Sequence, residues 1–314
     1  AKREWHQAVL RVEQQEPDRV TGLCCSLLGY SRQAYYQYQK QQEKEAFAEE
    51  LIVQEVLRHR RLQKRIGGRK LFGMMSNFLH QHAIGLGRDV FFNVLREYGL
   101  LVRIRRRKVI TTDSNHPYRK YPNLIKEFIP IAPNQLWVSD ITYIVIGNGF
   151  GYLSLITDAF SGKIVGFCLH KTLSAQGTIQ ALKQALKNNP NSKGLIHHSD
   201  RGVQYCCHEY VEILQKNHIK ISMTEKGDPL ENPIAERVNG ILKTELLEEN
   251  YHSFEQAKED VAVAISTYNH LRPHNSIGDL TPFEVHSLNG DIKPKRLWKN
   301  YYKPKSKEVE MDVV

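Results

Sequence analysis

The sequence contains few cysteines and no long apolar segment, and each absence excludes a class of protein. The five cysteines are an odd number, include two adjacent pairs and form no C-x-x-C motif, so they fit neither a disulfide framework nor a zinc site. No stretch approaches the roughly 18 apolar residues that a membrane-spanning helix requires. The opening segment, AKREWHQAVL, is too polar for a secretory signal. We therefore expect a cytoplasmic protein with reduced thiols and no membrane partner.

Positive charge is concentrated in one region of this 314-residue chain, whose net charge is +10. Residues 51–120 contain sixteen Lys or Arg and only four Asp or Glu, a balance of +12, so the other residues together carry −2. A basic region of this kind is the electrostatic footprint of a polyanionic partner. The alternative is a set of solvated helix faces, but the carboxylate pattern described below favours nucleic acid.

The first fifty residues are predicted to be helical and to contain a helix-turn-helix. An apolar helix follows Val20, a turn forms at Gly29, and Ser31 caps a second short helix that carries Arg32. The alternative is a plain helical hairpin.

A second helix-turn-helix pattern follows, with one helix over 68–82, a turn over 83–87 and a helix over 88–100 that could enter a major groove. Basic flanks at 58–65 and 103–108 suit phosphate contacts and favour DNA binding over a simple helical pair. The candidate DNA-contacting residues in this region are Arg88, Arg103, Arg105, Arg106, Arg107 and Lys108.

The pattern changes after residues 111–130, whose three prolines and many turn formers indicate a linker. Three β-rich runs separated by short turns predict an antiparallel meander, and helices then alternate with strands. This order predicts an α/β fold with a mixed sheet flanked by helices. The expected strands lie at 135–146, 151–160, 163–172, 194–200 and 220–224, and the expected helices at 174–189, at 207–219, around Glu236 and at 253–271.

The chain is therefore divided into four segments. Residues 1–50 and 51–125 are the two helix-turn-helix-like segments, the second ending in the basic linker, 126–287 is the α/β domain, and 288–314 is a tail that interleaves basic and aromatic residues. The tail suits DNA binding or docking on a partner subunit. A disordered solubilising tail is the alternative.

Three carboxylates stand out in the α/β domain: Asp140 within a strand, Asp200 at the end of another, and Glu236 in the first turn of a helix that Asn232 could cap and Pro233 could start. A charge on a central strand is costly unless it is paired or binds a metal. Carboxylates are the ligands that Mg²⁺ prefers, and two such ions can drive phosphodiester chemistry. We therefore expect these three to be catalytic and to bind metal.

Each carboxylate alone has an ordinary structural explanation, such as a strand end, a turn or a favourable charge near a helix start. It is their combination that favours catalysis, since two strand carboxylates and one helix carboxylate can converge at one sheet edge. Competing carboxylates are Asp158, which is more typical of a turn, and Glu231 and Glu245, which lie close to Glu236.

From roughly residue 68 to 287 the chain resembles the transposases of bacterial insertion sequences, specifically the second-frame product of the IS-three group, with its retroviral-integrase-like catalytic core. The strings that carry the resemblance are WVSDITYI, HHSDRGVQY, ENPIAERVNGILKTEL and YNHLRPHNSIGDLTPFEV, and the D, D-35-E spacing is met by Asp140, Asp200 and Glu236. The amino-terminal GYSRQAYY is also similar. The sequence has no amino-terminal His/Cys zinc module of the retroviral kind, which favours the bacterial group.

The resemblance implies an RNase H-like fold and a DDE-type transposase that uses two Mg²⁺ ions, with Mn²⁺ as a substitute. It also implies 3′-end cleavage and strand transfer through a circular intermediate. The implied partners are double-stranded DNA, as terminal inverted repeats and target, and at least one further copy of the chain, with nucleoid association when bound. Lys243, seven positions after Glu236, is implied to contact DNA phosphate from the same helix face. His198, Arg201, Gln204 and Tyr205 are implied to shape the site or touch DNA, whereas His197 and His198 are less suited to be metal ligands.

Two other functions remain open from the sequence. One is an RNase H-like nuclease that only hydrolyses DNA, and the other is a domesticated DNA-binding regulator with an inactive core. Intact carboxylates argue against the second.

Overall fold

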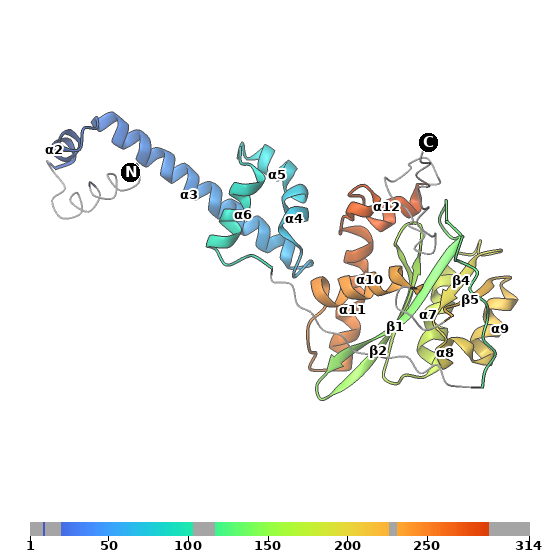
Figure 1. Cartoon of the computed structure of the whole chain (residues 1–314). Helices are drawn as coiled ribbons and strands as arrows, with labels where there is room; N and C mark the ends of the chain where they lie inside the picture. Colours follow the sequence, from blue (N-terminus) through green and yellow to red (C-terminus); the bar gives the residue numbers. More distant parts are fainter. Residues whose placement is uncertain (1–8, 10–19, 103–116, 226–230, 289–314) are drawn as a thin grey trace, which may run out of the picture. The chain divides into compact units, whose positions relative to one another are not determined.

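The computed structural model describes residue 9 and residues 20–102, 117–225 and 231–288 (Figure 1). The chain forms two compact units, one of residues 1–59 and 67–102 and the other of residues 60–66 and 103–314. Within the described ranges, no helix is long and apolar enough to cross a membrane. The predicted boundary at residue 50 falls inside a helix, and the predicted tail over 288–314 lies outside the described ranges except for residue 288.

The first unit is helical. Gly29 adopts a φ of 76° in the turn after the first of its helices, and Ser31 Oγ accepts a hydrogen bond from the Ala34 backbone N–H at 3.1 Å, so the predicted turn and cap are present. Its helices are α2 (Val20–Leu27), α3 (Arg32–Arg60), α4 (Gly68–Met74), α5 (Ser76–Gln81) and α6 (Arg88–Glu97).

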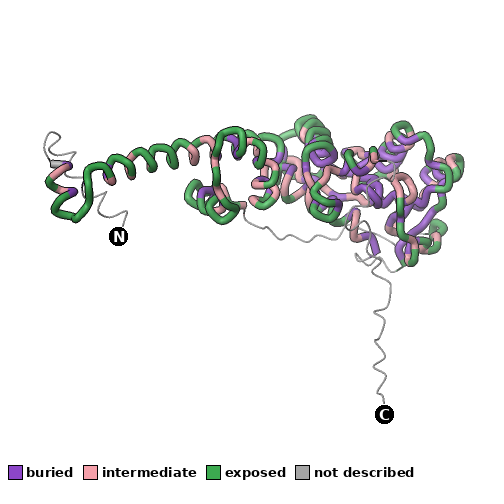
Figure 2. Tube along the Cα trace, turned by 90° about the horizontal axis from the view of Figure 1, so that it is seen from above, coloured by how far each residue is buried: buried purple, intermediate pink, exposed green. Residues whose placement is uncertain are grey.

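Two features of this unit differ from the sequence prediction. Helix α3 is 29 residues long rather than short, because it contains neither glycine nor proline and is rich in strong helix formers. The helix expected over 68–82 is instead two helices, α4 and α5, separated at Met75. Much of the middle of α3 is exposed (Figure 2).

The second unit contains a five-stranded mixed sheet in the order β3-β2-β1-β4-β5 (Figure 1). β1, β2 and β3 form the predicted antiparallel meander, and β4 pairs in parallel with both β1 and β5. The short turns at Gly147 and Gly162 permit antiparallel neighbours, whereas each parallel pairing needs a helical crossover. The strands are β1 (Leu136–Ile146), β2 (Gly149–Asp158), β3 (Ile164–His170), β4 (Ile196–Ser199) and β5 (Lys220–Met223).

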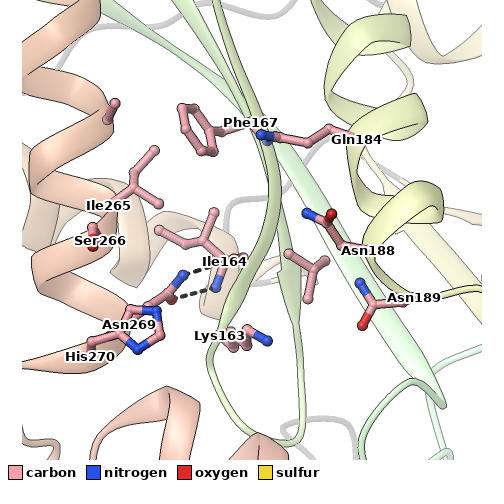
Figure 3. A pocket seen from close by; sticks show the side chains of 12 residues that line it. Lys163, Ile164, Phe167, Gln184, Asn188, Asn189, Ile265, Ser266, Asn269 and His270 are labelled. Carbon is pink, nitrogen blue, oxygen red and sulfur yellow. Dashed lines mark hydrogen bonds between the residues drawn. The ribbon is translucent and has the colours of Figure 1, made fainter.

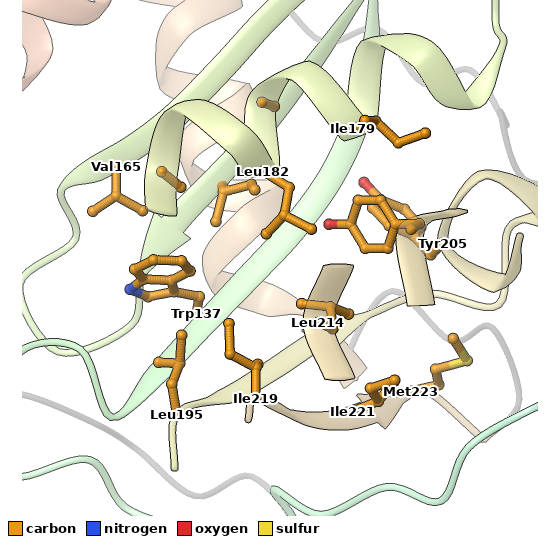
Figure 4. Close-up of a cluster of buried hydrophobic side chains, with 14 of the residues drawn as sticks. Trp137, Val165, Ile179, Leu182, Leu195, Tyr205, Leu214, Ile219, Ile221 and Met223 are labelled. Carbon is orange, nitrogen blue, oxygen red and sulfur yellow. The ribbon is translucent and has the colours of Figure 1, made fainter. Parts of the chain in front are cut away.

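Helices cover both faces of the sheet (Figure 1). On one face, a core around Trp137, Leu182 and Leu214 joins β1 to α7 and α9 (Figure 4). On the other, a core that includes Ile144 and Leu242 joins the sheet to α10, η2 and α11. The helices are α7 (Ala175–Asn188), α8 (Val203–Cys206), α9 (His208–Lys216), α10 (Pro233–Ile241), the π-helix η2 (Leu242–Leu246), α11 (Phe254–His270), the short η3 (Asn275–Ile277) and α12 (Pro282–Ser287).

Candidate active site

Asp140 and Asp200 lie level with each other on adjacent strands. β1 is the central strand of the sheet, and Val138 on it pairs in parallel with His198 on β4. Asp140 and Asp200 each follow two residues further along, and Asp200 comes directly after the last residue of β4. Both are partly buried. The parallel pairing of β1 with β4 therefore brings Asp140, in the middle of β1, level with Asp200 at the sheet edge where β4 ends.

Glu236 approaches this edge from helix α10. The helix begins at Pro233, and the exposed Glu236 lies in its first turn. The sequence predicted that Asn232 would cap this helix with its side chain, but its side chain makes no capping hydrogen bond. Its Nδ2 instead donates to the backbone oxygen of Ser139 at 2.9 Å, so Asn232 fixes the start of α10 to β1 beside Asp140.

Asn239 joins α10 directly to Asp140, and the sequence prediction missed it. Its Nδ2 donates to Asp140 Oδ2 at 2.6 Å. Asn232, Glu236 and Asn239 follow one another at spacings of four and three, which places them on one face of α10. That spacing was the signal available in the sequence.

The electrostatics of Asp140 link the three carboxylates. Burial raises the pKa of Asp140 to about 7, and the negative charges of Asp200 and Glu236 push it in the same direction. Hydrogen bonds from the Ile141 backbone and the Asn239 side chain oppose this shift. Asp200 and Glu236 therefore lie close enough to Asp140 to disfavour its charged form in the absence of a cation.

The carboxylate oxygens are nevertheless not arranged as a complete metal-binding site. Asp200 Oδ1 accepts a hydrogen bond from the Gly202 backbone N–H at 2.9 Å, and Asp140 Oδ2 faces Asn239. In the part of the chain that the structure describes, no three His, Cys, Asp or Glu side chains are grouped closely enough to hold a metal ion. Side-chain rotation would be needed to point all three carboxylates at one cation.

Lys243 lies in η2, where the helix widens to π geometry, rather than on a continuous α-helix. Its Nζ lies 3.8 Å from the centroid of the Tyr143 ring, which in turn contacts Phe150 edge to face. Burial lowers the pKa of Lys243 to about 8, and the charge of Asp140 opposes that shift. A π turn of this kind is a recurrent feature of functional sites.

His197 and His198 brace the sheet below the aspartates. His197 Nε2 lies 2.7 Å from Ser139 Oγ and 2.9 Å from Tyr210 Oη. Burial lowers the pKa of His197 to about 3 and that of His198 to about 4, so both rings are neutral. His198 Nε2 lies 3.2 Å from the backbone oxygen of Glu231, immediately before α10.

The competing carboxylates have structural partners. Asp158 accepts hydrogen bonds from the Asn134 and Ser161 backbone N–H groups at 2.7 and 2.8 Å, which is the turn role expected for it. Glu231 accepts a hydrogen bond from the Glu225 backbone N–H. Glu245 forms an ion pair of 2.7 Å with Arg272.

The candidate DNA contacts fall into different environments. Arg32 and Arg88 are exposed on the first unit, and Arg201 is partly buried beside Asp200. Gln204 is buried and its side chain donates to the backbone oxygen of Leu173 at 3.0 Å, which is a structural contact. Arg103, Arg105, Arg106, Arg107 and Lys108 lie outside the described residues.

A pocket lies away from the carboxylates, beside the edge strand β3 and between α7 and α11 (Figure 3). Asn269 pairs with the backbone N–H and oxygen of Ile164 at 2.9 and 3.0 Å, and Gln184 accepts from the Phe167 N–H at 2.7 Å. These amides occupy backbone groups that an added strand would need. The polar residues that line the pocket therefore cover the exposed edge of β3.

The sheet, its helices and the placement of the carboxylates define an RNase H-like domain of the integrase-core class. Models of the "Integrase core domain" family match residues 130–229 and 217–282. Among solved structures, the catalytic core domain of HTLV-2 integrase is 25% identical, with a TM-score of 0.40 over 49% of this chain and 97% of that one.

Two bacterial relatives extend the comparison beyond the core. The "Insertion element IS600 uncharacterized 31 kDa protein" of Shigella sonnei is 33% identical over 265 residues, which cover 82% of this chain and 95% of that protein. The "Transposase InsF for insertion sequence IS3A" of Escherichia coli (strain K12) is 31% identical over 198 residues, covering 62% and 69% respectively. The chain belongs to the transposases of bacterial insertion sequences, as its motifs predicted.

Proposed function

We propose that this transposase cleaves the 3′ ends of its insertion sequence and joins them to another DNA strand, with Asp140, Asp200 and Glu236 as ligands of divalent cations. The observation that carries the proposal is the approach of the three carboxylates from β1, β4 and α10, close enough for two of them to raise the pKa of the third. Like charges held together in this way are stabilised when a cation binds between them.

The donor set suits Mg²⁺, with Mn²⁺ as a substitute, because both favour oxygen ligands. A pair of such ions, when bound, activates the attacking oxygen and stabilises the leaving oxygen. Asn239 would orient the Asp140 carboxylate by its bond to Oδ2, and the contacts that fix α10 to β1 would place Glu236. Lys243 is partly buried and its ammonium group interacts with the charge of Asp140. It would contact a DNA phosphate.

The two proposed steps use the same groups. In cleavage, a water oxygen forms a bond to phosphorus while the 3′-oxygen leaves and takes up a proton. In joining, that 3′-hydroxyl loses its proton and attacks a phosphodiester, so one P–O bond forms and one breaks. If the first joining links the two ends of one element, the product is a circle.

DNA binding would be shared between the units. Helices α2 and α3, and α4 to α6, supply helix-turn-helix-like segments, with Arg32 and Arg88 exposed for contact with terminal repeats. Arg201, beside Asp200, would contact the reacting strand. Bringing two element ends together calls for at least a dimer of this chain on DNA.

The test replaces each carboxylate with its amide: Asp140→Asn, Asp200→Asn and Glu236→Gln. Each variant should lose at least about a thousandfold in cleavage and joining in Mg²⁺, because an amide is a poor cation ligand, while its affinity for element-end DNA stays within about twofold. Lys216→Ala, which removes an exposed side chain at the end of α9, is the control. Normal joining by any of the three amide variants would contradict the proposal.

The products distinguish this function from two others. A nuclease would yield nicked DNA and never a joined strand. A DNA-binding regulator would bind the ends and leave them intact in either metal.

A further inference from the structure

The short segment 60–66 belongs to the second unit although the chain on both sides of it belongs to the first. It lies at the end of η2, the π-helix that continues α10 and contains Lys243. Arg65 makes three hydrogen bonds there. Its backbone N–H donates to the Glu245 oxygen at 2.9 Å, its Nε donates to the Thr244 oxygen at 2.8 Å, and its Nη2 donates to the Leu247 oxygen.

These three oxygens lie at or just beyond the carboxyl end of the helix formed by α10 and η2, where backbone oxygens have no partner further along the helix. A guanidinium group is well suited to this position, because it offers several donors in a fixed plane and its charge complements the negative end of the helix dipole. Arg65 therefore closes the helix end from a segment about 180 residues away in the sequence.

The segment is itself fixed. Lys64 Nζ lies 2.8 Å from Glu248 Oε1 and 3.0 Å from Asp260 Oδ2, and Gln63 donates to the Leu271 oxygen at 3.3 Å. Gln63 and Ile66 are buried. The sequence had suggested that residues 58–65 contact phosphate, but Lys64 and Arg65 are engaged inside the unit instead.

We propose that Arg65 is a positioning residue for strand joining: by holding the end of η2, it sets the place of Lys243. The inference rests on the proposed function. Asn232 fixes the start of the helix and Asn239 its middle. At its end, Leu242 and Leu246 are buried in the core and Glu245 pairs with Arg272, and Arg65 adds the donors for the backbone oxygens. Without these donors the π turn can rewind to satisfy its own oxygens, and Lys243, which lies within that turn, moves with it.

The experiment measures single-turnover joining of pre-cleaved element ends at saturating DNA, together with affinity for the same DNA, in the full chain. Arg65→Ala should join at least about tenfold more slowly with DNA affinity within about twofold, since the residue acts on position and not on DNA. Added guanidinium ion at millimolar concentration should restore part of the rate by occupying the vacated site. Arg65→Lys keeps the positive charge and the backbone hydrogen bond but loses the planar set of guanidinium donors. Its joining rate should lie between those of Arg65→Ala and the parent.

Lys216→Ala, which removes an exposed cation from α9, should join like the parent and should not respond to guanidinium. Thermal unfolding of each variant shows whether it is folded. If Arg65→Ala is not folded, the joining rate of Arg65→Lys is used for the test. Three results would overturn the inference: joining at the parent rate, a slower rate explained by weaker DNA binding, or a slow rate in folded Arg65→Ala that guanidinium does not raise. Failure of the parent chain to join any ends would instead contradict the proposed function.

Discussion

At the scale of single residues, Asn239 is the side chain that orients Asp140, since its Nδ2 donates to Asp140 Oδ2 at 2.6 Å. In the sequence, Asp140, Asp200 and Glu236 could be proposed because acidic residues are conspicuous on a strand, at a strand end and at a helix start. Asn239 could not, since an asparagine inside a helix has no such signature. Its importance comes from a contact with a residue 99 positions away.

Asn239→Ala should slow joining by about tenfold, because Asp140 loses the donor that orients its carboxylate and stabilises its charge. Asn239→Asp should be at least as slow, since it substitutes a fourth negative charge for that donor. Asn188→Ala, an exposed asparagine on α7, serves as the matched control. The measurement is joining rate at saturating DNA, and an Asn239→Asp variant as fast as the parent would contradict the role assigned to the amide.

The buried His197 predicts a loss of stability in acid. Its pKa is lowered from 6.5 to about 3 in the folded protein, so between these values the unfolded chain binds a proton that the folded chain does not. Stability therefore falls as the pH decreases through this range, by about 2 kcal/mol between pH 7 and pH 5 from this residue.

His197→Gln keeps a hydrogen-bonding side chain but does not titrate. Urea unfolding of the variant should therefore show a change in stability between pH 7 and pH 5 that is smaller than the parent's by about 2 kcal/mol, whatever the stability of the variant at pH 7. Other titrating groups, His198 included, contribute to both proteins alike and cancel. Equal changes in the two proteins would mean that His197 is protonated in the folded state.

At the scale of elements, local pattern predicted most of the second unit and less of the first. The meander followed from β-rich runs and short turns, and the parallel strands from the helices between them. The predicted helix after Ser31 is too short because the turn signals mark where α3 begins, whereas the helix formers that follow extend it to Arg60. The π geometry of η2 and the attachment of residues 60–66 depend on contacts between distant segments, which no local pattern encodes.

The packing of α7 on β3 depends on Gly166. A Cβ atom there would lie 2.3 Å from the Ala181 backbone oxygen, which is too close to be tolerated without a shift of the helix. Gly166→Ala should destabilise the protein by about 1–3 kcal/mol. Gly240→Ala, in α10 with open space around its Cβ position, should instead stabilise by up to about 1 kcal/mol. Urea unfolding compares the pair, and the same sign for both would contradict this account of the packing.

At the scale of the whole molecule, the chain combines a helical unit with an integrase core that contains the carboxylates, and the helix formed by α10 and η2 is held at its start, middle and end. The concentration of positive charge in residues 51–120 was visible in the sequence and indicated a polyanionic partner. Composition could not show that some of those cations, Lys64 and Arg65 among them, are engaged within the protein. The local charge therefore predicts a polyanionic partner, but not every cation in the region is available to it.

The central claim is tested most directly by incubating the purified chain in Mg²⁺ with element ends that carry a free, labelled 3′-hydroxyl and with an unlabelled supercoiled plasmid. The account predicts labelled strands covalently joined to DNA, either to the plasmid or to a second element end, with no such product from Glu236→Gln. Labelled ends that remain bound but unjoined, or plasmid that is nicked without receiving the label, would contradict it.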